Sequence, residues 1–496
     1  MLRLLATAAY HPALIYVDTL KYLYGASPGS EPLGYTAVLR AILLAGGLGV
    51  VALVQHLLGL AMAAALYAVL LRRGLARWLA ALAVAPVLLD AYQVQMEQMI
   101  MPDVWFEALI VAGLAVLLWR PAVTVRVAAA AGLVLGTSAA VKQLGELLIV
   151  PAVLYVVAAG GYRAVRAAAA LSMAFALPVL ACCGFSYARN GHFRLAHRQS
   201  VTGRLVAAAD CATLKLPAAV RPLCPAPAAQ ANGPDWLEHS GKSPLYQAAV
   251  TPGTRGALIG ALDSAIAHQQ PLRVAVSIAQ DSLRLFAPVR GPSRWVAPIS
   301  RWQFQTSYPA YPPWVSLRPG NAIVVGVQHV AFGRFNFSVL RPSYGGPARV
   351  DRPVAAFLRS YQLDGGYTPG PLLALLSLAA LAGSLLALSR RRPAVPAGPA
   401  GPAALACLLF TATAVTVLLA PDVFEFSWRY ELPAVITLAP AGVLGAAVLV
   451  TAVRGGAVLA GRRSVLRRGD RQAGVSEDLA GGPGARPDPG GDAAQQ

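Results

Sequence analysis

The sequence predicts an all-α, polytopic membrane protein, and three observations support that prediction. Of 496 residues, 56% are hydrophobic and only 13% are charged. Apolar runs of about 18 to 20 residues recur, which is the length a helix needs to cross a hydrocarbon core of about 30 Å. Arginine clusters stand at the short turns between these runs, as in cytoplasmic loops. A soluble chain of this length would divide into domains and expose far more charge.

Nine spanning helices are expected, and threading them alternately through a membrane sorts the charges by side. The expected spans are residues 50–71, 76–95, 103–119, 123–141, 144–159, 167–187, 367–389, 403–420 and 432–453. One side then receives the arginine clusters at 72–77, 120–126, 163–166, 390–392 and 454–468, and the other receives the acids from Asp18 to Glu431. The positive-inside rule places the arginines in the cytoplasm and the acids outside the cell.

This threading gives five parts: a first external loop (1–35), membrane helices (36–187), a large external region of mixed structure (188–366), further membrane helices (367–453), and a basic, then disordered, cytoplasmic tail (454–496). Because the first loop is external, we expect residues 1–8 to be the end of a helix that begins upstream. Residues 35–49 are mostly apolar and are expected to lie along the membrane surface. The external region is dense in Pro, Trp and Tyr, which favours short strands over long helices.

The net charge of +19 does not indicate nucleic-acid binding. Much of the excess is arginine at helix ends, and no basic run is interleaved with aromatic residues as a nucleic-acid groove requires. The seven histidines show no metal-ligand spacing, so the sequence predicts no structural zinc, and it does not support a divalent ion beside Asp18. His56 is expected to form a hydrogen bond between helices.

The five cysteines divide into two groups. Cys182, Cys183 and Cys407 lie in apolar runs and are expected in the core. Cys211 and Cys224 lie in the external region, where an oxidising compartment would allow a disulfide. Two separate thiols are the alternative, because spacing alone does not supply the geometry of a bridge.

A series of short motifs in a fixed order resembles the GT-C superfamily of membrane glycosyltransferases. The motifs are His11–Leu14, Asp18, Tyr22, Pro32–Tyr35, Gln55–Leu60, Met96–Asp103 and Arg429–Pro433. Within that superfamily the chain is most similar to family 39, which includes protein O-mannosyltransferases, aminoarabinose-lipid A transferases and related actinobacterial enzymes. The external stretches Gly191–Arg194, Gly203–Leu205 and Ala209–Cys211 resemble the actinobacterial members.

The resemblance implies a GT-C-like helix bundle and an inverting transfer of a hexose or pentose from a polyprenyl-phosphate carrier. The acceptor would be a cell-envelope glycan, lipid or protein at the outer face of the cell membrane, and membrane lipids would be further partners. The resemblance assigns the catalytic base to Asp18. A positioned carboxylate that takes the acceptor proton accelerates such a step about 10²- to 10⁴-fold, and one displacement with one base inverts the anomeric centre.

Two acids and four cations are therefore candidate site residues. Asp18 is the candidate base, and its alternative interpretation is a solvated loop acid or a helix N-cap. Glu97 is the second catalytic candidate. The leaving phosphate needs cations, for which we select Lys142 and Arg429, followed by Lys21 and Arg40. Each of these cations could instead extend towards lipid headgroups. Asp103 and Glu107 are assigned to the start of a helix, where acids favour the dipole.

Two other classes of function remain open. A non-catalytic membrane assembly or binding protein would keep the fold and use the external region. A lipid or solute transporter would also have many spans, but it typically places ionisable groups near the bilayer midplane and often contains internal repeats. The sequence shows no repeat, and its acids are expected at the outer rim.

Overall fold

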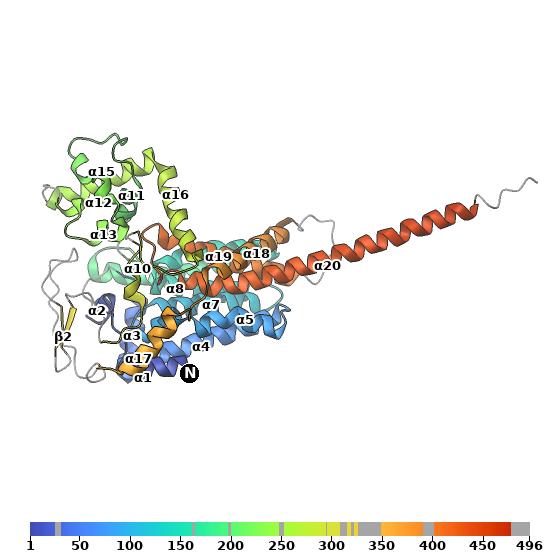
Figure 1. Ribbon diagram of the computed structural model, residues 1–496, viewed down its shortest axis with the longest axis horizontal. Helices are drawn as coiled ribbons and strands as arrows, with labels where there is room; N and C mark the ends of the chain where they lie inside the picture. Colours follow the sequence, from blue (N-terminus) through green and yellow to red (C-terminus); the bar gives the residue numbers. More distant parts are fainter. Residues whose placement is uncertain are drawn as a thin grey trace, which may run out of the picture.

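The structure is a computed structural model of residues 1–496, and it describes residues 1–24, 31–160, 164–196, 200–247, 252–293, 295–307, 315–318, 322–325, 349–389 and 401–477. Long helices run side by side in one bundle (Figure 1). They are α4 (Leu48–Arg72), α5 (Arg77–Leu89), α6 (Ala91–Gln98), α7 (Asp103–Trp119), α8 (Val125–Val141), α9 (Ile149–Gly160), α10 (Ala164–Asn190), α18 (Gly370–Ser389), α19 (Gly401–Asp422) and α20 (Leu432–Glu477).

Six helical segments among the described residues are long and apolar enough to cross a membrane. They are Leu48–Arg72, Gln143–Gly160, Ala164–Arg189, Gly370–Ser389, Pro402–Asp422 and Leu432–Arg454. A seventh span results if α5 and α6, which meet at a 50° bend, count as one. The other two expected spans, α7 and α8, are helices of 17 residues each, or about 26 Å at the α-helical rise. The chain is an α-helical, multi-pass membrane protein.

Small residues allow some of these helices to pack closely. Gly132 and Gly136 lie one turn apart on α8, and a Cβ at either would collide with the backbone of α10 at Leu171 or Phe175. Close approach through small residues four apart is a common way for helices to associate in lipid. Asp90 ends α5 and caps α6, because its Oδ1 accepts the backbone N–H of Tyr92 at 3.0 Å. This cap explains the bend between α5 and α6.

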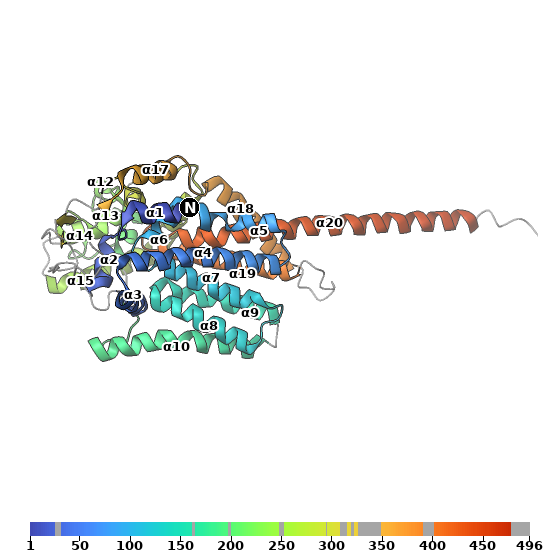
Figure 2. The ribbon, with the colours of Figure 1, turned by 90° about the horizontal axis from the view of Figure 1, so that it is seen from below.

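The external region forms at one end of the bundle, which we call the loop end (Figures 1 and 2). Its elements are α11 (Thr202–Ala208), η3 (Arg221–Leu223), α12 (Pro227–Gln230), α13 (Gly233–His239), α14 (Pro244–Gln247), α15 (Pro252–Gln269), α16 (Pro271–Ser282), η4 (Leu283–Phe286), η5 (Ile299–Trp302) and the hairpin of β2 (Val315–Arg318) and β3 (Ala322–Val325). A core of its own includes Val206, Leu223, Leu237, Leu262 and Ile266.

The expectation of short strands in the external region is largely wrong for its described residues, because helices predominate there. Several prolines of this region occupy the first turn of a helix, as in α12, α13 and α16. Proline is tolerated at that position because its missing N–H would have no partner within the helix. Tyr308, Tyr311 and Trp314 lie outside the described residues.

The first loop and the surface segment are also helical. Residues Leu2–Ala9 form α1, and β1 (Tyr10–His11) pairs antiparallel with β4 (Arg349–Val350) beside α17 (Arg352–Leu363). Next come α2 (Val17–Tyr24) and α3 (Leu33–Ala45). Figure 2 shows α3 nearly end-on, crossing the loop end rather than running with the bundle. This orientation agrees with a helix that lies along the membrane surface.

At the other end of the bundle, α20 extends far beyond its neighbours (Figure 1). The tail was expected to become disordered near Gly469, but the helix continues to Glu477. Arginine, glutamine, alanine and glutamate in residues 469–477 favour a helix and outweigh the two glycines there. Residues 478–496 lie outside the described part of the chain.

Cys211 and Cys224 form a disulfide, with their Cα atoms 5.8 Å apart and 13 residues apart in the sequence. We expect the Cys211→Ser, Cys224→Ser double variant to lower the stability of the external region by about 3 kcal/mol, because a loop of this size loses entropy in the unfolded chain when it is closed. Proteolysis of that region in increasing urea would measure the change. Cys182→Ser in α10 is the control, and equal urea midpoints for the two variants would contradict the expectation.

Candidate active site at the loop end

Arg429 lies between α19 and α20, and its buried guanidinium holds two carboxylates. Nη1 lies 3.1 Å from Asp18 Oδ2, and Nε lies 3.6 Å from Asp103 Oδ1. The side chain of Arg429 is 8% exposed and that of Asp18 is 20% exposed. A buried charge is stable only with partners of opposite charge. Arg429 therefore ties α2, which holds Asp18, to the start of α7, where Asp103 is the first residue.

Lys142 approaches the same cluster from the end of α8. It has an extended backbone between α8 and η1 (Gln143–Leu148), and Nζ lies 2.8 Å from Asp103 Oδ1. Its ammonium lies 4.8 Å from the ring centre of Tyr430 and 5.6 Å from that of Phe106. Asp103 is therefore the buried partner that compensates the charge of Lys142.

Aromatic rings form one side of this cluster. The Arg429 guanidinium lies 4.8 Å from the ring centre of Trp302 and 4.6 Å from that of Tyr430, whose hydroxyl also accepts from Nη2 at 2.8 Å. Tyr16 packs against Trp302 with ring centres 4.9 Å apart. Burial raises the pKa of Tyr16 and of Tyr430, so both hydroxyls keep their protons at neutral pH. Rings of this kind favour both cations and flat apolar faces.

Hydrogen bonds within the first loop and from it to the α6–α7 connection place Asp18. Thr19 Oγ1 accepts the N–H of Tyr16 at 2.9 Å and donates to the carbonyl of Ile100 at 2.8 Å. The carbonyl of Leu14 accepts the N–H of Ile100 at 3.0 Å. Because Ile100 lies three residues before Asp103, the first residue of α7, these bonds hold Asp18 near Asp103. Thr19 is fully buried, and its hydroxyl joins the first loop to the α6–α7 connection.

The structure brings together three of the six candidate residues. Asp18, Lys142 and Arg429 share one cluster through Asp103. Lys21 lies on α2, but its side chain is outside the described residues. Arg40 is exposed on α3, and within the described residues it forms no ion pair with Asp18 or Asp103.

Glu97 lies in a separate network inside the bundle. Its fully buried carboxylate pairs with Arg3 Nε at 2.7 Å and with His56 Nδ1 at 3.0 Å, and His56 Nε2 lies 2.8 Å from Gln98 Oε1. A Cβ at Gly59 would collide with this carboxylate, so the glycine makes room for it. The hydrogen bond predicted between helices at His56 is confirmed. Glu97 itself has no described contact with Asp18, and its catalytic role stays a prediction.

Sequence reasoning assigned Asp103 only to the start of a helix, whereas the structure makes it the link between Lys142 and Arg429. A signal existed, because Asp103 and Lys142 were expected at the same end of neighbouring spans. Trp302 and Tyr16 had no comparable signal, since their contact joins residues almost 300 positions apart in the sequence.

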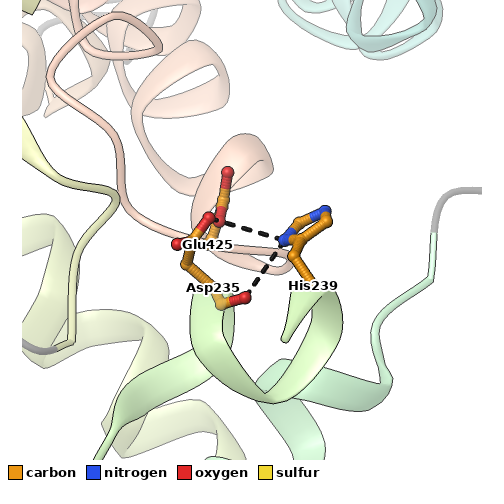
Figure 3. Close-up of side chains that lie close together, drawn as sticks. All are labelled: Asp235, His239 and Glu425. Atoms are coloured by element: carbon orange, nitrogen blue, oxygen red, sulfur yellow. Dashed lines mark hydrogen bonds and ion pairs between the residues drawn. The ribbon is translucent and has the colours of Figure 1, made fainter. Parts of the chain in front are cut away.

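A second group of titratable residues adjoins this cluster. Asp235 and His239 on α13 lie near Glu425, which belongs to the same segment as Arg429 (Figure 3). Arg301 donates to both oxygens of Asp235 at 3.1 and 3.3 Å, and it precedes Trp302 in the chain. Sequence reasoning did not predict this group, because Glu425 is distant from α13 in the sequence.

Burial and the charges of the neighbouring residues shift the pKa values within this group. Burial opposes ionisation of Asp235, but His239 and Arg301 outweigh it and lower the pKa of that carboxyl to about 2. Burial also opposes the charge on His239, yet the neighbouring acids raise its pKa to about 9. Burial and Asp235 raise the pKa of Glu425 to about 7. Asp235, His239 and Glu425 are the described residues whose donor atoms could hold a metal ion.

Comparison with known proteins finds no matching family model, no matching curated protein and no matching solved structure. The chemistry must therefore be argued from the site itself. It combines a partly exposed carboxylate, two cations and a wall of aromatic rings. Such a set can accept a proton and hold an anion within one small volume.

Loss of Lys142 is expected to leave Asp103 buried with too little positive charge. We expect Lys142→Met to reduce stability by about 3 kcal/mol, since breaking a buried ion pair from one side leaves an uncompensated charge. Adding Asp103→Asn should recover most of that loss. Thermal unfolding of the purified protein measures both effects, and Lys242→Met, at an exposed lysine of the external region, is the matched control. A Lys142 variant as stable as the control would show that the pair contributes little.

Proposed function

We propose that the chain is an inverting glycosyltransferase that moves a sugar from a polyprenyl-phosphate carrier to an acceptor at the outer face of the cell membrane. The main support is the group formed by Asp18, Arg429 and Lys142 at one end of the bundle. It contains one candidate base and two candidate phosphate ligands. The resemblance of the ordered motifs to the GT-C superfamily assigns the role of base to Asp18, and the two cations are proposed as phosphate ligands from their charge and position.

In the proposed reaction, the acceptor oxygen attacks the anomeric carbon of the donor sugar and forms the new C–O bond. The bond from that carbon to the phosphate oxygen breaks at the same time, and its electron pair leaves with the polyprenyl phosphate. Asp18 takes the acceptor proton and later releases it to water. A single displacement of this kind inverts the anomeric centre.

Arg429 and Lys142 would bind the phosphate of the donor and the leaving group. A guanidinium offers several N–H donors in a fork that fits phosphate oxygens, and an ammonium adds a compact charge. Both cations already neutralise carboxylates in the described structure. An arriving phosphate would compete with Asp18 for Arg429, and release from that ion pair would make the carboxylate a better base.

The aromatic side of the cluster supports a sugar as the transferred group. Trp302 and Tyr16 lie beside Arg429 and Asp18, so a sugar linked to a phosphate at Arg429 would meet their rings. Sugar rings present apolar C–H faces that pack on aromatic side chains, while their hydroxyls need donors and acceptors. The external region supplies Trp302, so the proposed acceptor side is the side on which that region lies.

We expect Asp18→Asn to reduce the rate of sugar transfer about 10²- to 10⁴-fold, because the neutral amide no longer accepts the acceptor proton. Transfer would be measured in membranes that contain the chain, with a panel of radiolabelled polyprenyl-phosphate hexoses and pentoses. Asp364→Asn is the matched control, because Asp364 is an exposed acid at the end of α17.

The outcomes separate the functional classes. Transfer by the Asp364 variant together with loss in the Asp18 variant, at equal expression, supports both the reaction and the base. Equal transfer by both variants would move the base elsewhere, with Glu97 the next residue to replace. No transfer from any donor by the unchanged chain would contradict the proposal and favour the assembly, binding or transport alternatives.

A further inference from the structure

Asp235, His239 and Glu425 place three metal-binding side chains around one point. One ligand atom from each residue can be chosen so that all three lie within 4.8 Å of one another. Figure 3 shows the imidazole of His239 turned towards both carboxylates. Its Nδ1 lies 3.4 Å from Asp235 Oδ1. The remaining ring nitrogen points away from the two acids in the same view.

The fold makes this convergence in two ways. Asp235 and His239 are four residues apart on α13, and that spacing puts two side chains on the same helix face. Glu425 comes from the segment 423–431, at the end of α19 and before α20. The three residues therefore bridge the external region and the membrane bundle. None of them is among the candidate base and phosphate ligands Asp18, Arg429 and Lys142.

We propose that Asp235, His239 and Glu425 bind one divalent transition-metal cation of the Zn²⁺ type. Zinc commonly takes one or more imidazole nitrogens together with carboxylate oxygens, and three protein ligands leave a fourth position for water. A donor set of two carboxylates and one imidazole also fits neighbouring first-row metals, whose relative affinities follow the Irving–Williams order. The sequence predicted no structural zinc because no histidine has a metal-ligand spacing along the chain. Glu425 lies almost 190 residues after His239, so such spacing does not reveal it.

Arg301 is compatible with this site. It donates to both oxygens of Asp235, but each carboxylate oxygen has a second lone pair that stays available to a cation. Partners of this kind orient the ligands of many metal sites. The side chain of Asp235 is 17% exposed and that of His239 is 41% exposed, so an ion can reach the site from solvent. Without metal, a proton on His239 would balance the two acids, and the metal would displace it.

A bound cation would join α13 to the segment that carries Arg429. Arg301 would then be fixed through Asp235, and the adjacent Trp302 would be held against the Arg429 guanidinium. The site would thus stiffen one wall of the candidate active site from outside. This inference does not depend on the proposed sugar transfer, because a cation can bind whether or not that reaction occurs.

The test uses the full chain, purified in detergent, stripped of metal with a chelator, and titrated with Zn²⁺ alone. We expect one Zn²⁺ per chain by calorimetry and by metal analysis after dialysis, together with a rise in Tm that depends on Zn²⁺ concentration. His239→Ala and Glu425→Gln should each weaken the affinity by more than about 100-fold, since the loss of outer partners alone weakens metal binding about 10- to 100-fold.

His268→Ala is the matched control, because His268 is an exposed histidine of the same external region. It should bind Zn²⁺ as tightly as the unchanged chain. The Tm without metal shows whether each variant is folded, and because His239 is part-exposed, at least its alanine variant is expected to pass that check. The proposal is overturned if the unchanged chain binds no Zn²⁺ saturably, or if folded His239→Ala binds it with unchanged affinity.

Discussion

The buried guanidinium of Arg429 is the constraint on which the loop end depends. A charge removed from water must be compensated by partners in good geometry. Arg429 obtains that compensation from Asp18 on α2 and Asp103 on α7, and it lies against the ring of Trp302. Three parts of the chain that are distant in sequence therefore have to meet at one point. A change in the position of any one of them would leave a charge without its partner.

Charge and exposure together distinguish the two carboxylates of this cluster. Asp103 is 1% exposed and lies near both Lys142 and Arg429, so its negative charge is firmly held. Asp18 is 20% exposed and pairs with Arg429. A base must exchange partners and reach its substrate. Asp18 meets that requirement better than Asp103, while Asp103 is better placed to fix the two cations.

The sequence predicts the parts of this molecule that depend on periodicity and charge at span ends. It places Lys142 and Arg429 at the same end because each lies beside the end of an apolar run, and it places Asp18 there because the first loop falls on the same side of the membrane. It does not predict which of these residues touch, and it separates Asp103 from them because an acid at a helix start has a local explanation. The group of Asp235, His239 and Glu425 is harder still, since two ligands lie on a short helix and the third lies beyond α19. Tertiary packing brings such residues together, and their spacing in the sequence does not predict it.

The external region is part of the candidate site rather than an addition to it. Trp302 covers Arg429, and the preceding residue, Arg301, is held by Asp235 on α13. Glu425 and Arg429 are four residues apart in the same short segment between α19 and α20, so the position of one restricts the position of the other. The wall of the site therefore depends on contacts made within the external region. Any chemistry that needs Arg429 and Trp302 in register also needs that region folded and docked on the bundle.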